Sequence, residues 1–121
     1  IAQSIAASAS YLQSRGIFHG DLYAHNILSH PSGDSFLGDF GAAGFFDPSD
    51  KTISDALERI EVRAFGCLLQ DLLERCPPQD IETHGEVFQT LLHMQQACMS
   101  PTVMRRPGFE SICHKLGGLV V

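Results

Sequence analysis

Residues 19–28 read H-G-D-L-Y-A-H-N-I-L, and the rest of the chain is organised around this stretch. Apolar residues flank it closely on both sides, while its polar centre forms a loop that packing alone does not require. Asp21 and Asn26 lie five positions apart on this loop, so their side chains can point into one small volume. A second carboxylate, Asp39, follows on the glycine-flanked turn G-D-F-G at residues 38–41. A carboxylate can accept a proton from an attacking hydroxyl, and oxygen ligands suit a hard cation such as Mg²⁺.

The bulk composition is that of an ordinary globular domain. The chain has 121 residues, of which 44% are hydrophobic and 18% are charged, which is enough for one modest core. Its net charge of −6 argues against a face that binds nucleic acid or an anionic membrane. No apolar run approaches the ~18 residues that a membrane span needs. We therefore expect neither nucleic acid nor a membrane as a partner of this segment.

Cysteine usage and the start of the chain bear on its context. The four cysteines form no C-x-x-C pair and show no zinc-like spacing with histidine. We interpret them as reduced and mostly buried, which favours a cytoplasmic protein. The chain begins at Ile1 in the middle of a pattern, so we expect it to be a piece of a longer protein.

The first half of the chain predicts one helix and a small β-hairpin. Apolar residues at helical spacing predict an amphipathic helix over residues 1–15, which ends at Gly16. Residues 17–18 are typical of a single short strand. Residues 27–37 hold two short apolar runs around the Pro- and Gly-containing turn 30–34, which predicts the hairpin.

The second half predicts an irregular segment followed by helices. Residues 42–56 are rich in Gly, Pro, Ser and Asp and predict irregular structure. A helix with a wide apolar face from Ile60 to Leu73 is predicted to begin near Leu57 and to end at the C-P-P run. Two more helices are predicted, over residues 85–99 and 107–117. The expected fold class is therefore mainly α with a small β-hairpin.

The two motifs at the start resemble the catalytic loop and metal-binding turn of the protein kinase family. The kinase signature is H-R-D-L-x-x-x-N followed by D-F-G, and here it reads H-G-D-L-Y-A-H-N and D-F-G. Residues 10–19 resemble the approach "YLHSRGIVH", residues 61–69 resemble "DVWSFGVLL", and residues 98–109 resemble the final "C…RP.F" motif. The matches cover nearly the whole chain in the right order. They imply the large, C-terminal lobe of the α+β protein-kinase-like fold.

The resemblance implies a chemical role for each matched residue. Asp21 would be the catalytic base that orients and deprotonates the substrate hydroxyl. Asn26 and Asp39 would hold the Mg²⁺ that bridges the ATP phosphates. Leu28 would lie under the adenine ring, with Leu68 and Leu72 beneath it. ATP and Mg²⁺ are therefore the expected cofactors, and a protein is the expected substrate.

The resemblance also implies structural roles. His19 and Phe40 would stack in a packed column between the metal-binding turn and the buried helix. Glu61 would take the place of the helix Asp that anchors the catalytic-loop backbone. Arg106 would pair with an acid at the end of the activation segment, for which Glu58 is the nearby candidate.

Several positions depart from the kinase pattern. Gly20 replaces the usual Arg, and Tyr23 replaces the Lys commonly found two positions after the catalytic Asp. The segment between Asp39 and Glu61 is short and lacks a clean A-P-E, and the stretch after Leu73 leaves no room for the usual extra helix. The Gly-rich loop, the V-A-I-K lysine and its partner Glu have no match. We therefore expect residues 1–121 to be a truncated large lobe without its small lobe.

Three functions compete at this stage. The first is a catalytic Ser/Thr-type protein kinase that transfers the γ-phosphate of ATP to a hydroxyl. The second is a small-molecule kinase of the aminoglycoside or choline type, in which H-G-D-L-x-x-x-N is usual. The third is a pseudokinase that serves as a binding scaffold. Under the first, the isolated chain is expected to be inactive, with the missing small lobe as its natural partner and self-association as the alternative.

Overall fold

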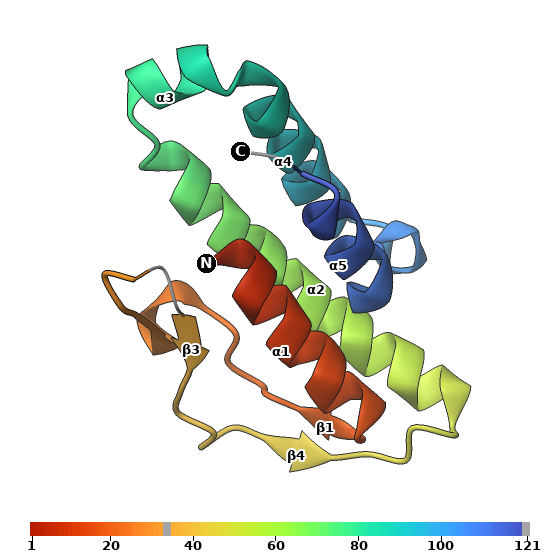
Figure 1. Cartoon of the computed structure of the whole chain (residues 1–121). Coiled ribbons are helices and arrows are strands. Elements are labelled where there is room, and N and C mark those ends of the chain that lie inside the picture. Colours follow the sequence, from red (N-terminus) through yellow and green to blue (C-terminus); the bar gives the residue numbers. More distant parts are fainter. Residues whose placement is uncertain (33–34, 120–121) are drawn as a thin grey trace.

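The computed structural model describes residues 1–32 and 35–119, and it is mainly helical with two small antiparallel sheets. The long helices are α1 (Ala2–Ser14), α2 (Lys51–Glu74), α4 (Gly85–Cys98) and α5 (Phe109–Gly117). Helix α2 runs diagonally through the molecule and packs against α4, while α1 packs against α5 (Figure 1). The predicted fold class, mainly α with a small hairpin, is confirmed.

Helix α2 supplies the centre of the core because its apolar residues recur at helical spacing. The ring of Phe65 is fully buried and meets the ring of Phe109 edge-on, with centroids 5.9 Å apart. Gly66 allows α4 to approach closely, since a Cβ there would lie 2.6 Å from Met99 Cγ. The other buried apolar residues of α2 are Val62, Ala64, Leu68 and Leu69.

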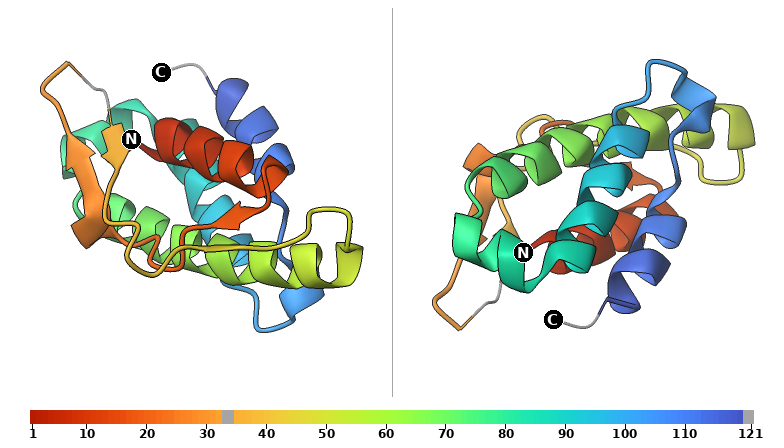
Figure 2. Two further views of the ribbon diagram at one scale, coloured as in Figure 1. Left: turned by 90° about the horizontal axis from the view of Figure 1, so that it is seen from below. Right: turned by 90° about the horizontal axis from the view of Figure 1, so that it is seen from above.

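The hairpin forms as predicted, from strands β2 (Ile27–Ser29) and β3 (Ser35–Leu37). Ile27 pairs with Leu37, and both pack against the core. Leu28 pairs with Phe36 on the opposite face, where they are 67% and 60% exposed. Positions 33–34 of the predicted turn lie outside the described residues. Both views in Figure 2 place the hairpin on the far side of α1 from α5.

The single short strand predicted at residues 17–18 has a partner. Strand β1 (Ile17–Phe18) pairs antiparallel with β4 (Gly44–Phe45), and the N–H of Phe46 donates to the carbonyl of Gly16 at 2.8 Å. The prediction that residues 42–56 are irregular is therefore wrong at this point. A two-residue strand carries no periodicity, so only pairing with a distant segment reveals it.

The start of one helix, the exposure of one of its residues and one additional helix also differ from the prediction. Helix α2 begins at Lys51, well before Leu57, because the Asp50 side chain accepts the N–H of Ile53 at 3.3 Å and caps the helix. Its early turns are exposed, and Ile60, predicted on the apolar face, is 62% exposed. The C-P-P run is followed by an unpredicted short helix, α3 (Pro78–Thr83), with proline in its first turn.

The remaining short elements in the described residues are two 3₁₀ turns, one in the polar loop and one before α5. Turn η1 (Ala24–Asn26) closes the polar loop, and turn η2 (Val103–Arg105) precedes α5, which begins at Phe109 and not at the predicted residue 107.

All four cysteines are free, but only Cys98 is fully buried, so the expectation of mostly buried thiols is wrong. Among the described residues, no helix combines the length and the apolar character that crossing a membrane requires.

The core packing makes a direct prediction about stability. Phe65→Ala should lower the free energy of unfolding by about 3–5 kcal/mol, because it empties a fully buried site against Phe109. Phe45→Ala is the matched control, since that ring is 86% exposed and its loss should change stability by less than about 0.5 kcal/mol. Urea denaturation followed by circular dichroism measures both. Equal losses in the two variants would contradict this description of the core.

Candidate active site

The polar loop is fastened to the central helix by one buried carboxylate. The N–H of Gly20 donates to Glu61 Oε1 at 2.8 Å, and Glu61 is only 4% exposed. Burial raises the pKa of Glu61, and the backbone N–H groups of Gly20 and His19 partly offset this rise. The expected anchoring role of Glu61 is thus visible as a contact between helix α2 and the loop.

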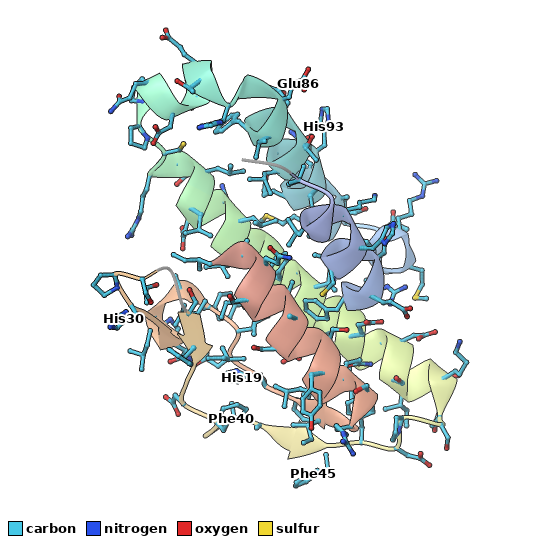
Figure 3. All side chains as sticks on the ribbon, in the orientation of Figure 1. His19, His30, Phe40, Phe45, Glu86 and His93 are labelled. Atoms are coloured by element: carbon cyan, nitrogen blue, oxygen red, sulfur yellow. The ribbon has the colours of Figure 1, made fainter. Side chains whose placement is uncertain are left out.

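His19 links the loop to the turn that carries Asp39. Its ring is fully buried; Nε2 donates to the carbonyl of Gly38 at 2.8 Å, and Nδ1 accepts the N–H of Asp21 at 3.1 Å. These partners place the ring proton on Nε2. The ring of Phe40 meets His19 edge-on at 4.8 Å (Figure 3). His19 is therefore a structural histidine, and its two nitrogens are both occupied.

Asp21 and Asn26 are held together as the sequence predicts. Asn26 Nδ2 donates to both the carboxylate Oδ2 and the main-chain carbonyl of Asp21, each at 2.8 Å. His25 Nε2 lies 3.2 Å from the same Oδ2. The hydrogen bond from Asn26, and then that from His25, holds the pKa of Asp21 below its usual value. Asp21 is therefore ionised at neutral pH.

The turn that carries Asp39 is connected to Asn26 through the backbone of Gly38. The N–H of Gly38 donates to the carbonyl of Asn26 at 2.8 Å, which brings the turn beside the loop. Asp39 has a left-handed backbone, with φ of 49°, and its Oδ1 accepts the N–H of Gly41 at 3.2 Å. Its carboxylate faces solvent.

The donor set fits a hard cation. Asn26 uses its amide nitrogen on Asp21, so its amide oxygen is not part of that contact and could bind a cation, and Asp39 has an exposed carboxylate. Mg²⁺ takes one or two such protein oxygens together with the phosphates of its substrate. Across residues 1–32 and 35–119, no group of three or more His, Cys, Asp or Glu side chains is arranged for a metal.

Two other residues that the kinase resemblance singled out differ in burial. Leu28 is on the outer face of the hairpin and 67% exposed, whereas Leu68 lies in the core and is 2% exposed. The sequence alone predicts that His25 faces solvent without a role; its side chain is exposed, but the turn η1 brings it to the carboxylate of Asp21. The ring of Tyr23 stacks beside His25, with centroids 6.2 Å apart.

Arg106 and Glu58 do not pair with each other as expected. Arg106 donates from Nε to the carbonyl of Ser100 and from its guanidinium to the carbonyl of Arg59, at 2.9 and 3.1 Å. Glu58 bonds to Arg59 and caps α5 by accepting the N–H of Phe109 at 3.0 Å. Glu58 lies at the start of α5, so each side chain has another partner.

The chain is similar in sequence to several curated protein kinases. It is 27% identical to mouse protein-tyrosine kinase 6 over 152 residues, covering 98% of this chain and 34% of the relative. It is 30% identical to a probable serine/threonine-protein kinase of Dictyostelium discoideum over 105 residues, covering 72% of this chain and 16% of the relative. It is 26% identical to the serine/threonine-protein kinase PKH2 of Saccharomyces cerevisiae over 143 residues, covering 95% of this chain and 13% of the relative. No family model matches the chain.

The fold is similar to a solved kinase structure. That structure is described as a divergent kinase that lacks the glycine-rich loop and regulates membrane ultrastructure of the Toxoplasma parasitophorous vacuole. It superposes with a TM-score of 0.69 at 18% identity, over 92% of this chain and 37% of the other. The chain is thus protein-kinase-like, with the fold of a kinase large lobe, and it spans between 13% and 34% of the curated relatives it matches.

Gly20, the position that departs from the kinase Arg, makes a prediction about stability. Its φ is +86°, and a Cβ there would lie 2.3 Å from the carbonyl oxygen of Ala42. Gly20→Ala should therefore lower the free energy of unfolding by about 1–3 kcal/mol or more. At Gly85 a Cβ meets nothing within 4 Å, so Gly85→Ala should leave stability unchanged or raise it by up to about 1 kcal/mol. Thermal and urea denaturation measure the stability of both variants. An unchanged free energy of unfolding in Gly20→Ala would show that the backbone of Ala42 does not restrict position 20.

Proposed function

We propose that this chain is the large lobe of an ATP-dependent protein kinase of the Ser/Thr type. The observation that supports the proposal best is the continuous set of hydrogen bonds that connects Asp21, Asn26 and the turn of Asp39 to buried residues. A loop that only joined two strands would not need an ionised carboxylate held by an amide and a histidine. The similarity to curated kinases supports the same reaction class.

In this proposal each residue positions a reacting group. Asp21 accepts the hydrogen of the substrate hydroxyl and aligns its oxygen, and its lowered pKa makes it ionised for this purpose. Asn26 and Asp39 would hold Mg²⁺, which neutralises negative charge on the phosphates of ATP. Leu28, exposed on the outer face of the hairpin, would support the adenine ring. Phosphoryl transfer depends mainly on such positioning and charge stabilisation.

Two other functions remain as alternatives, and specific residues favour each. Gly20 and Tyr23 fit the loop of small-molecule kinases of the aminoglycoside or choline type better than that of protein kinases. Tyr23 also removes the usual lysine, which favours a pseudokinase scaffold; His25 is the basic side chain that contacts Asp21 instead. Transfer of labelled phosphate from ATP by the full-length protein to a protein, or to a sugar or amine, separates the three.

The proposal includes a small lobe supplied by another part of the protein. The outer hairpin face presents Leu28 and Phe36 to solvent at 67% and 60% exposure, and Phe40 follows at 49%. An apolar patch of this kind is typical of a surface that another domain covers. We expect the small lobe to cover it, with ATP between the two lobes. The proposal also includes a cytoplasmic location, because the four cysteines are free and reduced thiols are typical of that compartment.

Substitutions in the full-length protein test the assigned chemistry. Asp21→Asn should lower kcat by about 10²–10⁴ with little effect on ATP binding, because it removes the group that accepts the hydroxyl proton. Asp39→Ala should instead weaken Mg·ATP binding, because it removes a charged metal ligand. Steady-state kinetics and nucleotide titration distinguish the effects. Mild and equal effects from both would favour the pseudokinase.

The isolated chain should not bind Mg·ATP measurably and should associate with other copies of itself. Half of the proposed nucleotide site lies on the small lobe, so Mg·ATP should show no binding at micromolar concentration in isothermal titration. Sedimentation should show self-association that the double variant Leu28→Ser, Phe36→Ser reduces, since both side chains are exposed on one face. Phe45→Ser, at 86% exposure on another strand, is the control that should leave association unchanged. Micromolar ATP binding would overturn the first expectation, and a strict monomer the second.

A further inference from the structure

A second concave site lies away from the catalytic-type loop. A pocket of about 400 Å³ opens between α4, the turn η2 and α5. Figure 3 shows His93 on α4, well apart from His19, His30 and Phe40 around the loop and hairpin. The lining residues are Thr90, His93, Met94, Ala97, Arg105, Pro107, Ile112 and Lys115. None of them has a role in the proposed phosphoryl transfer.

The pocket is basic in an acidic chain. His93, Arg105 and Lys115 line it, no acidic residue does, and the whole chain carries a net charge of −6. In the described part of the chain, none of these three side chains makes a hydrogen bond or an ion pair with another residue. Lys115 also lies near the buried thiol of Cys98. Burial raises the pKa of this thiol, the charge of Lys115 partly offsets the rise, and the resulting pKa is about 12. Unpaired cations gathered at one hollow favour an anionic partner.

The floor of the same pocket is apolar. Met94 and Ile112 form it at 6% and 1% exposure, beside Ala97 and Pro107. The neighbouring hollow between α2 and α5 differs, because its basic residues Lys51, Arg59 and His114 are accompanied by Asp55, Glu58 and Glu110. Of these two hollows, the first combines an apolar floor with positive charge that no acidic lining residue offsets.

We propose that this pocket binds a short peptide segment of a partner protein, in which an acidic side chain stands next to an apolar one. The apolar side chain would fill the floor over Met94 and Ile112, and the carboxylate would meet Arg105 and Lys115 at the rim. A volume of about 400 Å³ suits a few side chains and not a folded surface. The proposal stands independently of the kinase chemistry, since it uses none of the loop residues.

A peptide fits these observations better than an anionic membrane. A membrane surface presents charge over a wide plane, and a chain of net charge −6 with two cations, Arg105 and Lys115, in one hollow would be repelled by most of that plane. A peptide can enter the hollow while the rest of its chain stays in solvent. The acidic surroundings then raise specificity, because they disfavour acidic segments elsewhere on the protein.

The test uses the 121-residue chain and a blocked pentapeptide of two glutamates flanked by leucines. Methyl NMR should show saturable shifts at Met94 and Ile112, with a Kd below about 1 mM. Lys115→Ala and Arg105→Ala should each weaken binding by about threefold to tenfold, and added salt should weaken it further. Lys51→Ala, which removes an exposed cation from the other hollow, is the matched control and should leave Kd unchanged.

The chemistry of the ligand is tested by two further arms. A peptide in which glutamines replace the glutamates should bind at least about fivefold more weakly. Vesicles that contain phosphatidylserine should not bind the chain in sedimentation. Equal binding of the glutamine peptide, shifts that spread away from the pocket, no saturation, or binding of vesicles but not of the peptide would each overturn the proposal. Circular dichroism confirms that the variants are folded, as expected for exposed positions.

Discussion

The hydrogen bond from the N–H of Gly20 to the carboxylate of Glu61 is the contact on which the candidate site depends. Glu61 belongs to the central helix and is nearly excluded from water, so its carboxylate requires donors, and the loop backbone supplies them. From this anchor a series of contacts runs outward: His19 bonds Gly38, and Gly38 bonds Asn26. A buried carboxylate of the central helix is thereby connected to Asn26 and to the turn that carries Asp39.

This arrangement suits a site whose work is positioning. The loop that carries Asp21 is too short to pack by itself, so its geometry comes from the buried groups at both of its ends. The hairpin continues the loop and turns Leu28 and Phe36 toward solvent. The resulting surface is polar at the loop and apolar at the hairpin, and the proposed function assigns these parts to a nucleotide and to a second lobe.

The departures from the kinase pattern come with compensating contacts. Where Gly20 replaces the usual Arg, the backbone of Ala42, in the segment after D-F-G, lies so close to the loop that a Cβ at position 20 would not fit. Where the segment before α2 is short, Glu58 caps α5, and Arg106 ties the carbonyls of Arg59 and Ser100 together. These contacts connect the loop, the central helix and α5 in a chain whose segment between the turn and the central helix is short.

The sequence by itself determined the order of the main elements, the presence of the hairpin and the proximity of Asp21 and Asn26, because periodicity and short spacings are local properties. Only the tertiary structure decided the pairing of β1 with β4, the early start of α2 at its Asp50 cap, the partners of Arg106, and the contact of His25 with Asp21. Each of these depends on segments far apart in the chain or on the direction of one side chain. Hydrophobic patterning carries no information about either, so the packed fold had to supply it.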